Sequence, residues 1–393
     1  MQNGSNKFFG ISEKYLLIFF FISIFIFKLP PPQYPFLYVK IQFIQAYSDG
    51  VYFRSLVGSI YSFLVNKYDI PHLYASFTFI LISTFTLLYF FLQKVVIKKN
   101  GMYSKEFLLY ALVMLSPVGV LFFFNVGQFY RLDTVLVFLY LISILSIVYN
   151  DKYLLVSYFF ITIIAILTHE SYLFIFVPVL FLIILSEIIR NNKSKYYVAS
   201  FICVNLSFVM LFLYIKSFRH INTEDVLLSI NNRTNLEDYN EAISNNVFPH
   251  LKLIYESTIS DNINHSLNSL FTANGIITIV TNVLTQIPLV LIIYKSLKNK
   301  NVVNVLLSII PLLIAVAMCF IGTDLVRWFS MTSLSYLGII TYLMKNEEIF
   351  IKHSSFEMIT LLVFYLSLGR YKAWYLGVYF LDYLEIIQKN NYY

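Results

Sequence analysis

The chain has 393 residues, of which 59% are hydrophobic and 12% are charged, and its mean hydropathy is +0.72. Soluble globular domains carry about 45–50% apolar and about 25% charged residues, so this composition excludes an ordinary soluble domain and predicts an integral membrane protein. The net charge of +7 does not indicate nucleic-acid binding, because cytoplasmic loops that fix the topology of a membrane protein explain it better.

Long apolar runs predict the membrane-spanning segments, which must be helical because lipid offers the backbone no hydrogen-bond partners. The run at 14–30 is expected to be the first span and not a signal peptide, since Lys28-Leu-Pro-Pro-Pro follows it without a small-residue cleavage site. A last segment, 374–388, contains Asp382 and Glu385 and is expected to span the membrane or to lie in its interface. The candidates between these two are 71–93, 106–125, 132–149, 153–168, 172–189, 196–216, 274–295, 302–321, 326–344 and 355–369.

The predicted fold class is therefore an all-α polytopic membrane protein, a single transmembrane domain over residues 1–393 with about 11–12 transmembrane helices. Two long segments separate these spans. The first, 31–70, is semi-apolar and aromatic with scattered polar residues, which predicts juxtamembrane helices lying in the membrane surface. The second, 217–270, is the one long polar stretch of the sequence and is expected to form a large loop.

Lysine and arginine residues predict the orientation, because they are enriched in the cytoplasmic loops of membrane proteins. With a cytoplasmic N-terminus, both long segments, 31–70 and 217–270, face away from the cytoplasm. The loops on the cytoplasmic side then hold more than half of the 28 basic residues, namely Lys7, Lys14, Lys94, Lys98, Lys99, Lys105, Lys152, Arg190, Lys193, Lys195, Lys295, Lys298, Lys300, Lys345 and Lys352.

Charged residues at the opposite ends of the spans form the candidate site, since an ionisable group at membrane depth costs at least about 2.5–3.5 kcal/mol. Asp49 and Arg54, in Ser-Asp-Gly-Val-Tyr-Phe-Arg, are either a carboxylate that accepts a hydroxyl proton beside a phosphate-binding guanidinium or an ordinary surface pair. Arg131 and Asp133 begin the span at 132–149. The helix dipole explains that aspartate, whereas the arginine needs a partner or an anion.

Three further groups belong to the candidate site. His169 and Glu170 lie in a tight turn between two apolar runs, where a neutral histidine can act as a base or donor and a partly desolvated glutamate has a raised pKa. The alternative is a polar turn at the interface. Asp324 and Arg327, in Gly-Thr-Asp-Leu-Val-Arg-Trp, can pair with each other or contribute to substrate binding. Arg370 is a further basic candidate. Converging arginines would bind a diphosphate and carboxylates would activate a hydroxyl.

No metal and no cofactor are expected. Cys203 and Cys319 lie in apolar runs without a His or second Cys at ligand spacing, which argues against a metal site or a disulfide framework. An ion channel would place a ring of like groups along its pore, and a secondary transporter would place charges near the midplane on broken helices. The candidate charges lie instead at the ends of the spans, which is not typical of either class.

The layout of these residues resembles the GT-C superfamily of membrane glycosyltransferases over most of the chain. Those enzymes use polyprenyl-linked sugars on the extracytoplasmic face. They place an acidic residue in a long first outer loop with juxtamembrane helices, which Asp49 in 31–70 matches. Many carry a second acidic motif in the next outer loop, where Asp133 falls, and a larger loop after the seventh span, as 217–270 is here.

The length, the Phe/Ile/Tyr-rich composition and the Arg, His and Asp residues at outer span ends also resemble Wzy-type O-antigen and capsule polymerases, which are bacterial inner-membrane enzymes. That resemblance implies arginines on the donor pyrophosphate and an acidic or histidine base on the acceptor hydroxyl. The residues that match are Arg54, Arg131 and Arg327 for the phosphate, and Asp49, His169 or Glu170 for the base.

The function that the resemblance implies is polymerisation of polyprenyl-diphosphate-linked oligosaccharide units on the extracytoplasmic face, without a metal. The expected partners are that lipid-linked oligosaccharide, the lipid bilayer and a chain-length regulator protein, and no nucleic acid. Many such polymerases have two sizeable outer loops in the second half of the chain, whereas here only 217–270 is long. This leaves open a GT-C transferase that adds a single sugar from a polyprenyl-phosphate donor. A lipid-linked oligosaccharide flippase or another transporter is the non-enzymatic alternative.

Overall fold

The computed structural model describes residues 7–8, 11–12, 37–49, 53–65, 67–92, 105–116, 131–149, 153–217, 222–234, 248, 251–252, 255–256, 258–322, 325–351 and 353–368. The regular secondary structure of these residues is helical, apart from an antiparallel pair of two-residue strands, β1 (Lys7–Phe8) and β2 (Ile11–Ser12), and one isolated bridge between Leu297 and Ile349. The expected spans at 14–30 and 374–388 lie outside the described residues.

Four helices are long and apolar enough to cross a membrane: Pro71–Phe90 within α4 (Ile70–Leu92), α11 (Lys195–Ser217), α16 (Ala273–Ser296) and α17 (Val302–Cys319). They leave large apolar side chains uncovered, and Phe79, Met210 and Leu313 are 71%, 65% and 52% exposed. Rows of exposed apolar side chains are unfavourable in water and ordinary in lipid. The helical secondary structure and these apolar helices support the prediction of an all-α membrane protein.

The other predicted spans are also helical where the structure describes them. They are α6 (Lys105–Leu115), α7 (Asp133–Tyr149), α8 (Leu154–Thr168), α18 (Leu325–Lys345) and α19 (Ser355–Leu368). Residues 117–125 of the span expected at 106–125 lie outside the described residues. The span expected at 172–189 is not one continuous helix, because α9 (Ser171–Ile175) and α10 (Val177–Arg190) meet at Phe176. Pro178 accounts for the break, since it lacks the N–H that a continuous helix needs and its ring clashes with the preceding turn.

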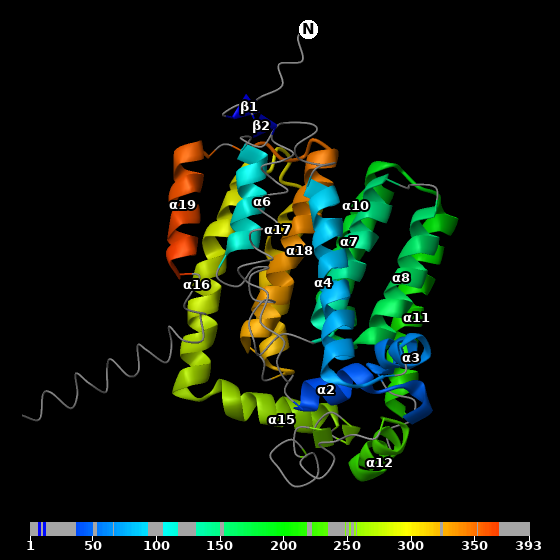
Figure 1. The fold of residues 1–393 in the computed structure, drawn as a ribbon. Helices are drawn as coiled ribbons and strands as arrows, with labels where there is room; N and C mark the ends of the chain where they lie inside the picture. The colour runs from blue at the N-terminus through cyan, green and yellow to red at the C-terminus, as the bar shows by residue number, and fades with distance from the viewer. Residues whose placement is uncertain are drawn as a thin grey trace, which may run out of the picture. The chain divides into compact units, whose positions relative to one another are not determined.

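The chain divides into two compact units, and each is described by itself. Unit 1 comprises Met1–Gln93 and Phe123–Thr258, and unit 2 comprises Lys94–Phe122 and Ile259–Tyr393. In unit 1, α4, α7, α8, α10 and α11 stand side by side, with α7 against α4 and α8, and α8 against α11 (Figure 1).

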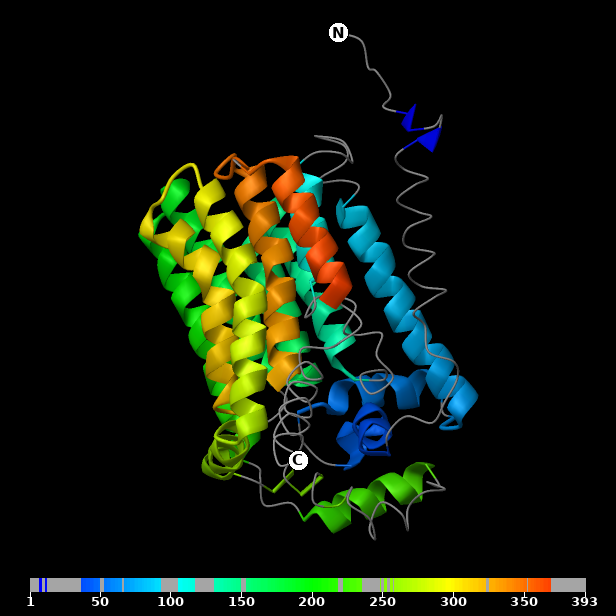
Figure 2. The same ribbon diagram turned by 90° about the vertical axis from the view of Figure 1, so that its left-hand side faces the viewer.

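Four shorter helices of unit 1 lie across one end of these upright helices (Figure 2). They are α2 (Leu37–Ile44), the 3-10 helix η1 (Tyr47–Asp49), α3 (Ser55–Leu64) and α12 (Thr223–Thr234). The first three belong to the segment 31–70, and α12 belongs to the segment 217–270. α3 packs against both α2 and α8, and α12 contacts η1.

Gly58 allows α2 and α3 to approach closely. A Cβ atom at position 58 would lie 1.9 Å from the backbone oxygen of Gln45, so a side chain there would force the two helices apart. The rings of Phe43, Tyr61 and Phe77 join these helices to α4 through edge-on contacts, with centroids 5.6 Å apart for Phe43–Tyr61 and 6.1 Å apart for Phe43–Phe77. This packing fixes the start of α3, where Arg54 lies.

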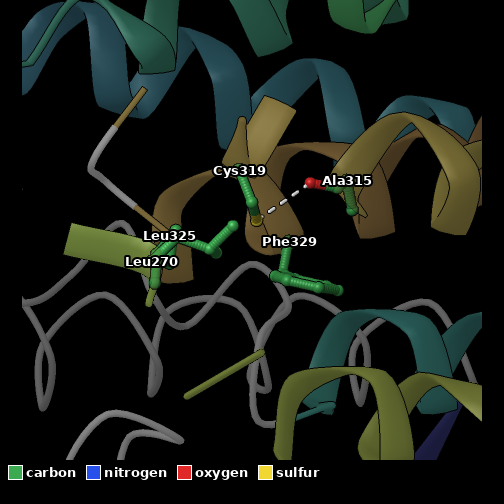
Figure 3. Packing of buried hydrophobic residues seen from close by; sticks show 5 residues of the cluster. All are labelled: Leu270, Ala315, Cys319, Leu325 and Phe329. Carbon is green, nitrogen blue, oxygen red and sulfur yellow. Dashed lines mark hydrogen bonds between the residues drawn. The ribbon is translucent and has the colours of Figure 1, made fainter. Parts of the chain in front are cut away.

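In unit 2, α18 is the central helix. Leu325 and every residue from Arg327 to Met344 are buried, and α18 packs against α16, α17 and α6. At its start, an apolar cluster joins it to α17 and to α15 (Ile259–Leu270), which runs across the end of α16. Figure 3 shows the members of this cluster, Leu270, Ala315, Cys319, Leu325 and Phe329.

Prolines interrupt the hydrogen bonding of two helices in unit 2, and a tyrosine hydroxyl bonds a carbonyl close to each proline. Pro288 lies within α16, and the carbonyl of Thr285 accepts a hydrogen bond of 2.5 Å from the hydroxyl of Tyr365. Pro311 lies within α17, and the carbonyl of Ser308 accepts one of 3.0 Å from Tyr336. In both helices the acceptor is three residues before the proline. The missing proline N–H would have bonded the carbonyl four residues back, so each tyrosine hydroxyl bonds the adjacent carbonyl of the same turn.

Candidate functional site

At the end of unit 1 that the short helices lie across, two carboxylates each form an ion pair with an arginine. The pairs are not those expected from the sequence. Asp49 and Arg54 are near each other in the chain, but they do not form a pair. Arg54 instead binds Glu170, and Asp49 binds Arg233. Both pairs join a guanidinium to a carboxylate, but they differ in exposure and in the other hydrogen bonds that the carboxylate accepts.

The Arg54–Glu170 pair is a two-bond fork. Arg54 Nη2 donates to Glu170 Oε1 at 2.5 Å, and Arg54 Nε donates to Oε2 at 3.1 Å. The backbone N–H of Arg54 also donates to the carbonyl of Leu167 at 3.1 Å. Arg54 therefore ties the start of α3 to the end of α8 through both its backbone and its side chain.

The backbone of Arg54 is in the left-handed region, with φ 77° and ψ −1°. This conformation costs roughly 1–2 kcal/mol for a residue with a side chain and must be held by its neighbours. The next residue, Ser55, is buried and accepts a hydrogen bond from Gln45 Nε2 at 3.0 Å. The preceding residue, Phe53, stacks on Phe212 of α11 with ring centroids 5.4 Å apart. Both flanks of Arg54 are thus fixed.

Glu170 is ionised, and its side chain is partly exposed to solvent. Its burial acts to raise its pKa, but the charges of Arg54 and His169 and the hydrogen bonds from Arg54 outweigh this and hold the pKa of Glu170 well below its usual range. The side chain of Glu170 is 22% exposed, against 13% for Arg54. The earlier expectation of a raised pKa for this carboxyl is therefore wrong, because the sequence did not reveal its guanidinium partner.

His169 lies in the same turn and is only 2% exposed. Its Nδ1 accepts a hydrogen bond from the backbone N–H of Ser171 at 3.1 Å and lies 3.2 Å from Glu170 Oε2. His169 thus shapes the turn that presents Glu170.

The Asp49–Arg233 pair is more enclosed, and the Asp49 side chain is only 1% exposed. Arg233 Nη2 donates to Oδ2 at 2.6 Å and Nε to Oδ1 at 3.1 Å. Asp49 also accepts from the backbone N–H of Ala46 at 2.9 Å and from Ser229 Oγ at 3.0 Å. Four donors therefore saturate a carboxylate that has almost no contact with solvent.

Arg233 uses all five of its N–H groups, since Nη1 donates to Ser62 Oγ and Tyr68 OH at 2.8 Å each and Nη2 also donates to the carbonyl of Ile44 at 2.8 Å. Sequence reasoning missed this residue because it lies in a polar stretch. The available signal was its spacing, because Arg233 follows the buried Val226 and Ile230 at i+7 and i+3 and so shares their face of α12.

A second contact joins the segments 217–270 and 31–70. The hydroxyl of Tyr255 donates to Gln45 Oε1 at 2.6 Å, and Gln45 in turn donates to Ser55. Nearby, Glu256 Oε1 accepts from both the backbone N–H and the hydroxyl of Thr223 at 2.9 and 2.7 Å. Burial would raise the pKa of Glu256, but these hydrogen bonds lower it below its usual value. The two long segments therefore build one polar layer beside Arg54.

The remaining candidates are distributed over both units. In unit 1, Asp133 is 1% exposed at the first residue of α7 and Arg131 is half-buried just before it. In unit 2, Arg327 is 9% exposed, and its Cζ lies 4.7 Å from the ring of Trp328. Asp324 and Arg370 lie outside the described residues. The structure thus brings Arg54, His169 and Glu170 together.

Among the described residues, no three His, Cys, Asp or Glu side chains lie close enough together to hold a metal ion. Comparison of the chain with protein-family models, with curated proteins and with solved structures finds no match. The function is therefore inferred from the chemistry of the residues themselves.

Proposed function

We propose that this protein is a membrane glycosyltransferase that polymerises polyprenyl-diphosphate-linked oligosaccharide units into O-antigen or capsule polysaccharide. The observation that carries the proposal is the Arg54–Glu170 fork, a partly exposed carboxylate bound to a partly exposed guanidinium. A glycosyl transfer of this kind needs a base for the acceptor hydroxyl and a cation for the leaving diphosphate. These two residues supply both groups.

In the proposed reaction, the carboxylate of Glu170 accepts the proton of the acceptor hydroxyl. The hydroxyl oxygen forms a bond to the anomeric carbon of the donor sugar. The bond from that carbon to the diphosphate oxygen breaks, and polyprenyl diphosphate leaves with the electron pair. A positioned general base contributes about 10²–10⁴-fold in rate, and a bidentate arginine stabilises the developing charge. Arg131, a further arginine of unit 1, would add to that charge.

Asp49 has a structural role in this proposal, although the resemblance to GT-C enzymes implied an acidic residue of the first outer loop as a catalytic group. Four hydrogen-bond donors and a side chain that is 1% exposed leave Asp49 poorly suited to accept a proton from a sugar. Glu170, at 22%, is the more accessible carboxylate. We therefore assign the base to the turn after α8.

The proposed orientation places Glu170 on the face away from the cytoplasm. In unit 1, the α9–α10 segment begins directly after Glu170 and ends at Arg190, which Lys193 and Lys195 follow. The basic loop and the Arg54–Glu170 fork thus lie at opposite ends of the same helices (Figure 1). Because basic loops stay in the cytoplasm, this arrangement supports the proposed orientation of unit 1. The bacterial inner membrane, about 11–12 spans and a cytoplasmic N-terminus belong to the same proposal.

The test is to delete the gene in its host and to analyse surface polysaccharide on a gel after complementation with variants. Cells with Glu170→Gln or Arg54→Ala are expected to lose the ladder of polysaccharide bands of increasing length and to retain a single repeat unit. The matched control is Glu187→Gln, since Glu187 pairs with Arg190 at 2.6 Å at the other end of unit 1. It is expected to keep the ladder. A normal ladder from Glu170→Gln at normal expression contradicts the assignment. An intact ladder with altered serology after gene deletion supports the single-sugar transferase instead.

A lipid-linked oligosaccharide transporter is the second candidate, and one feature of unit 2 favours it. Asn282 and Gln286 are buried near the middle of α16, on one face, and Pro288 interrupts the same helix. Their amide nitrogens donate to the carbonyls of Thr278 and Phe329 at 2.7 and 3.0 Å. Polar groups at mid-span in a proline-interrupted helix are typical of transporters. Gene deletion would then trap the single unit on the cytoplasmic face.

A further inference from the structure

The two N–H groups with which Arg54 binds Glu170 form the edge that a guanidinium also uses for phosphate. Nε and Nη2 lie side by side, and both donate to the carboxylate. Phosphate and carboxylate oxygens match this fork equally well. The edge can hold one of them at a time. In the structure, the carboxylate occupies it.

A carboxylate in such a fork is a weak base, because protonation would abolish its attraction to the guanidinium. General-base catalysis works best when the proton affinity of the base is suited to the working pH. Glu170 must therefore lose its partner before it can take a proton from a sugar hydroxyl efficiently. Within the proposed reaction, the donor diphosphate is the group that competes for Arg54.

Resting on the proposed function, we infer that Arg54 is a partner-switching residue, which leaves Glu170 when it binds the diphosphate of the lipid-linked donor and so activates Glu170 as the base. The enzyme then holds an active base only while a donor is bound. The product polyprenyl diphosphate keeps Arg54 engaged and inhibits the return to the resting pair.

The surroundings of Arg54 allow its side chain to switch while its backbone stays in place. The backbone N–H is held by Leu167, the ring of Phe53 by Phe212, and the hydroxyl of Ser55 by Gln45. Because the residues on both sides of Arg54 are fixed, the side chain of Arg54 can change its conformation while the backbone stays in place.

Two charged or titratable groups act on Glu170, namely Arg54 from the start of α3 and His169 from its own turn. The imidazole of His169 accepts a hydrogen bond from the backbone N–H of Ser171, so its position does not depend on Arg54. Departure of the guanidinium therefore removes the stronger of the two attractions that keep Glu170 ionised. The burial of Glu170 then favours its neutral form, so that it takes up a proton at a higher pH.

Difference infrared spectroscopy on the full-length protein in lipid nanodiscs tests the switch, with farnesyl diphosphate as the probe. Addition of the probe is expected to shift the carboxylate stretching band in the wild-type protein and in Glu187→Gln, and to leave Glu170→Gln unchanged. Arg54→Lys, which keeps the charge and loses the fork, is expected to bind the probe about tenfold more weakly. Its carboxylate band is expected to be already shifted without probe.

The outcomes separate the switch from the proposed function. Probe binding, measured by titration calorimetry, without any band that depends on Glu170 overturns the switch and leaves the glycosyltransferase proposal intact. This is the result if phosphate approaches Arg54 through Nη1 and the fork stays closed. Failure of the wild-type protein to bind farnesyl diphosphate overturns both. The same band shift with inorganic pyrophosphate supports the switch and shows that the diphosphate group suffices without the lipid chain.

Discussion

Replacing Arg233 with alanine is expected to release α12 from η1 and α3 and to destabilise unit 1. Arg233 fills all five of its donor positions with groups from the segment 31–70. Its removal takes the bidentate guanidinium away from the Asp49 carboxylate, which is 1% exposed. The loss is larger than that of one hydrogen bond, because a buried charge without its counter-charge is strongly unfavourable.

The expected cost can be worked from this geometry. Breaking a buried ion pair by removing one partner costs about 3–5 kcal/mol. The Arg233 side chain is 20% exposed, and Asp49 keeps its bonds from Ala46 and Ser229, so we place the loss at about 3 kcal/mol. Asp49→Ala combined with Arg233→Ala removes both charges. A coupling energy of at least about 1 kcal/mol between the two sites is therefore expected.

Thermal unfolding and amide hydrogen exchange of the purified protein measure the two parts of this prediction. Arg233→Ala is expected to lower the melting temperature and to speed exchange in α12. The control is Lys252→Ala, because Lys252 is 59% exposed and only 3.6 Å from Glu256, a pair worth about 0–1 kcal/mol. If Arg233→Ala costs less than about 1 kcal/mol and leaves exchange in α12 unchanged, the reasoning from the pair is refuted.

Three further predictions follow from other contacts. Because the folded-state pKa of Glu170 is lowered, its stabilising effect is complete above the ordinary pKa of about 4.3 and is lost as the pH falls through the lowered pKa. Glu170→Gln should therefore weaken the dependence of the melting temperature on pH in this acid range. The same pH dependence in the variant and the wild type contradicts the pairing. Tyr336→Phe should cost about 0.5–1.5 kcal/mol in thermal unfolding, since it removes the donor to Ser308, and no loss would mean that this carbonyl needs no donor. In intact cells of a variant without Cys203 and Cys319, an impermeant thiol reagent should label Asn232→Cys and spare Ser194→Cys, and the reverse labelling would invert the proposed orientation.

The helices were predictable from the sequence because the length of an apolar run is a local property. α11, α16 and α17 agree with the predicted spans to within a few residues. The interruption at Phe176 was also encoded locally, by Pro178, and was overlooked because the apolar run continues through it. Local sequence thus predicts where helices lie better than where they bend.

The pairs were not predictable, because each joins residues far apart in the chain. Arg54 and Glu170 are separated by 116 positions, and Asp49 and Arg233 by 184. Nearness in sequence suggested Asp49 as the partner of Arg54, but the left-handed backbone at Arg54 and the close approach of α2 and α3 at Gly58 set the directions of the two side chains. The turn at His169 and Glu170 was identified because polar groups between apolar runs are conspicuous without knowledge of their partners.

Exposure and hydrogen-bond supply distinguish the two arginine–carboxylate pairs, although their chemistry is the same. Asp49 has four donors from three residues and almost no exposed surface, so a proton from a substrate would have to displace a complete set of bonds. The fork that binds Glu170 comes from one arginine, and both partners are partly exposed. A single competing anion can therefore open the second pair and not the first. That difference makes Asp49 part of the scaffold and Glu170 the candidate for chemistry.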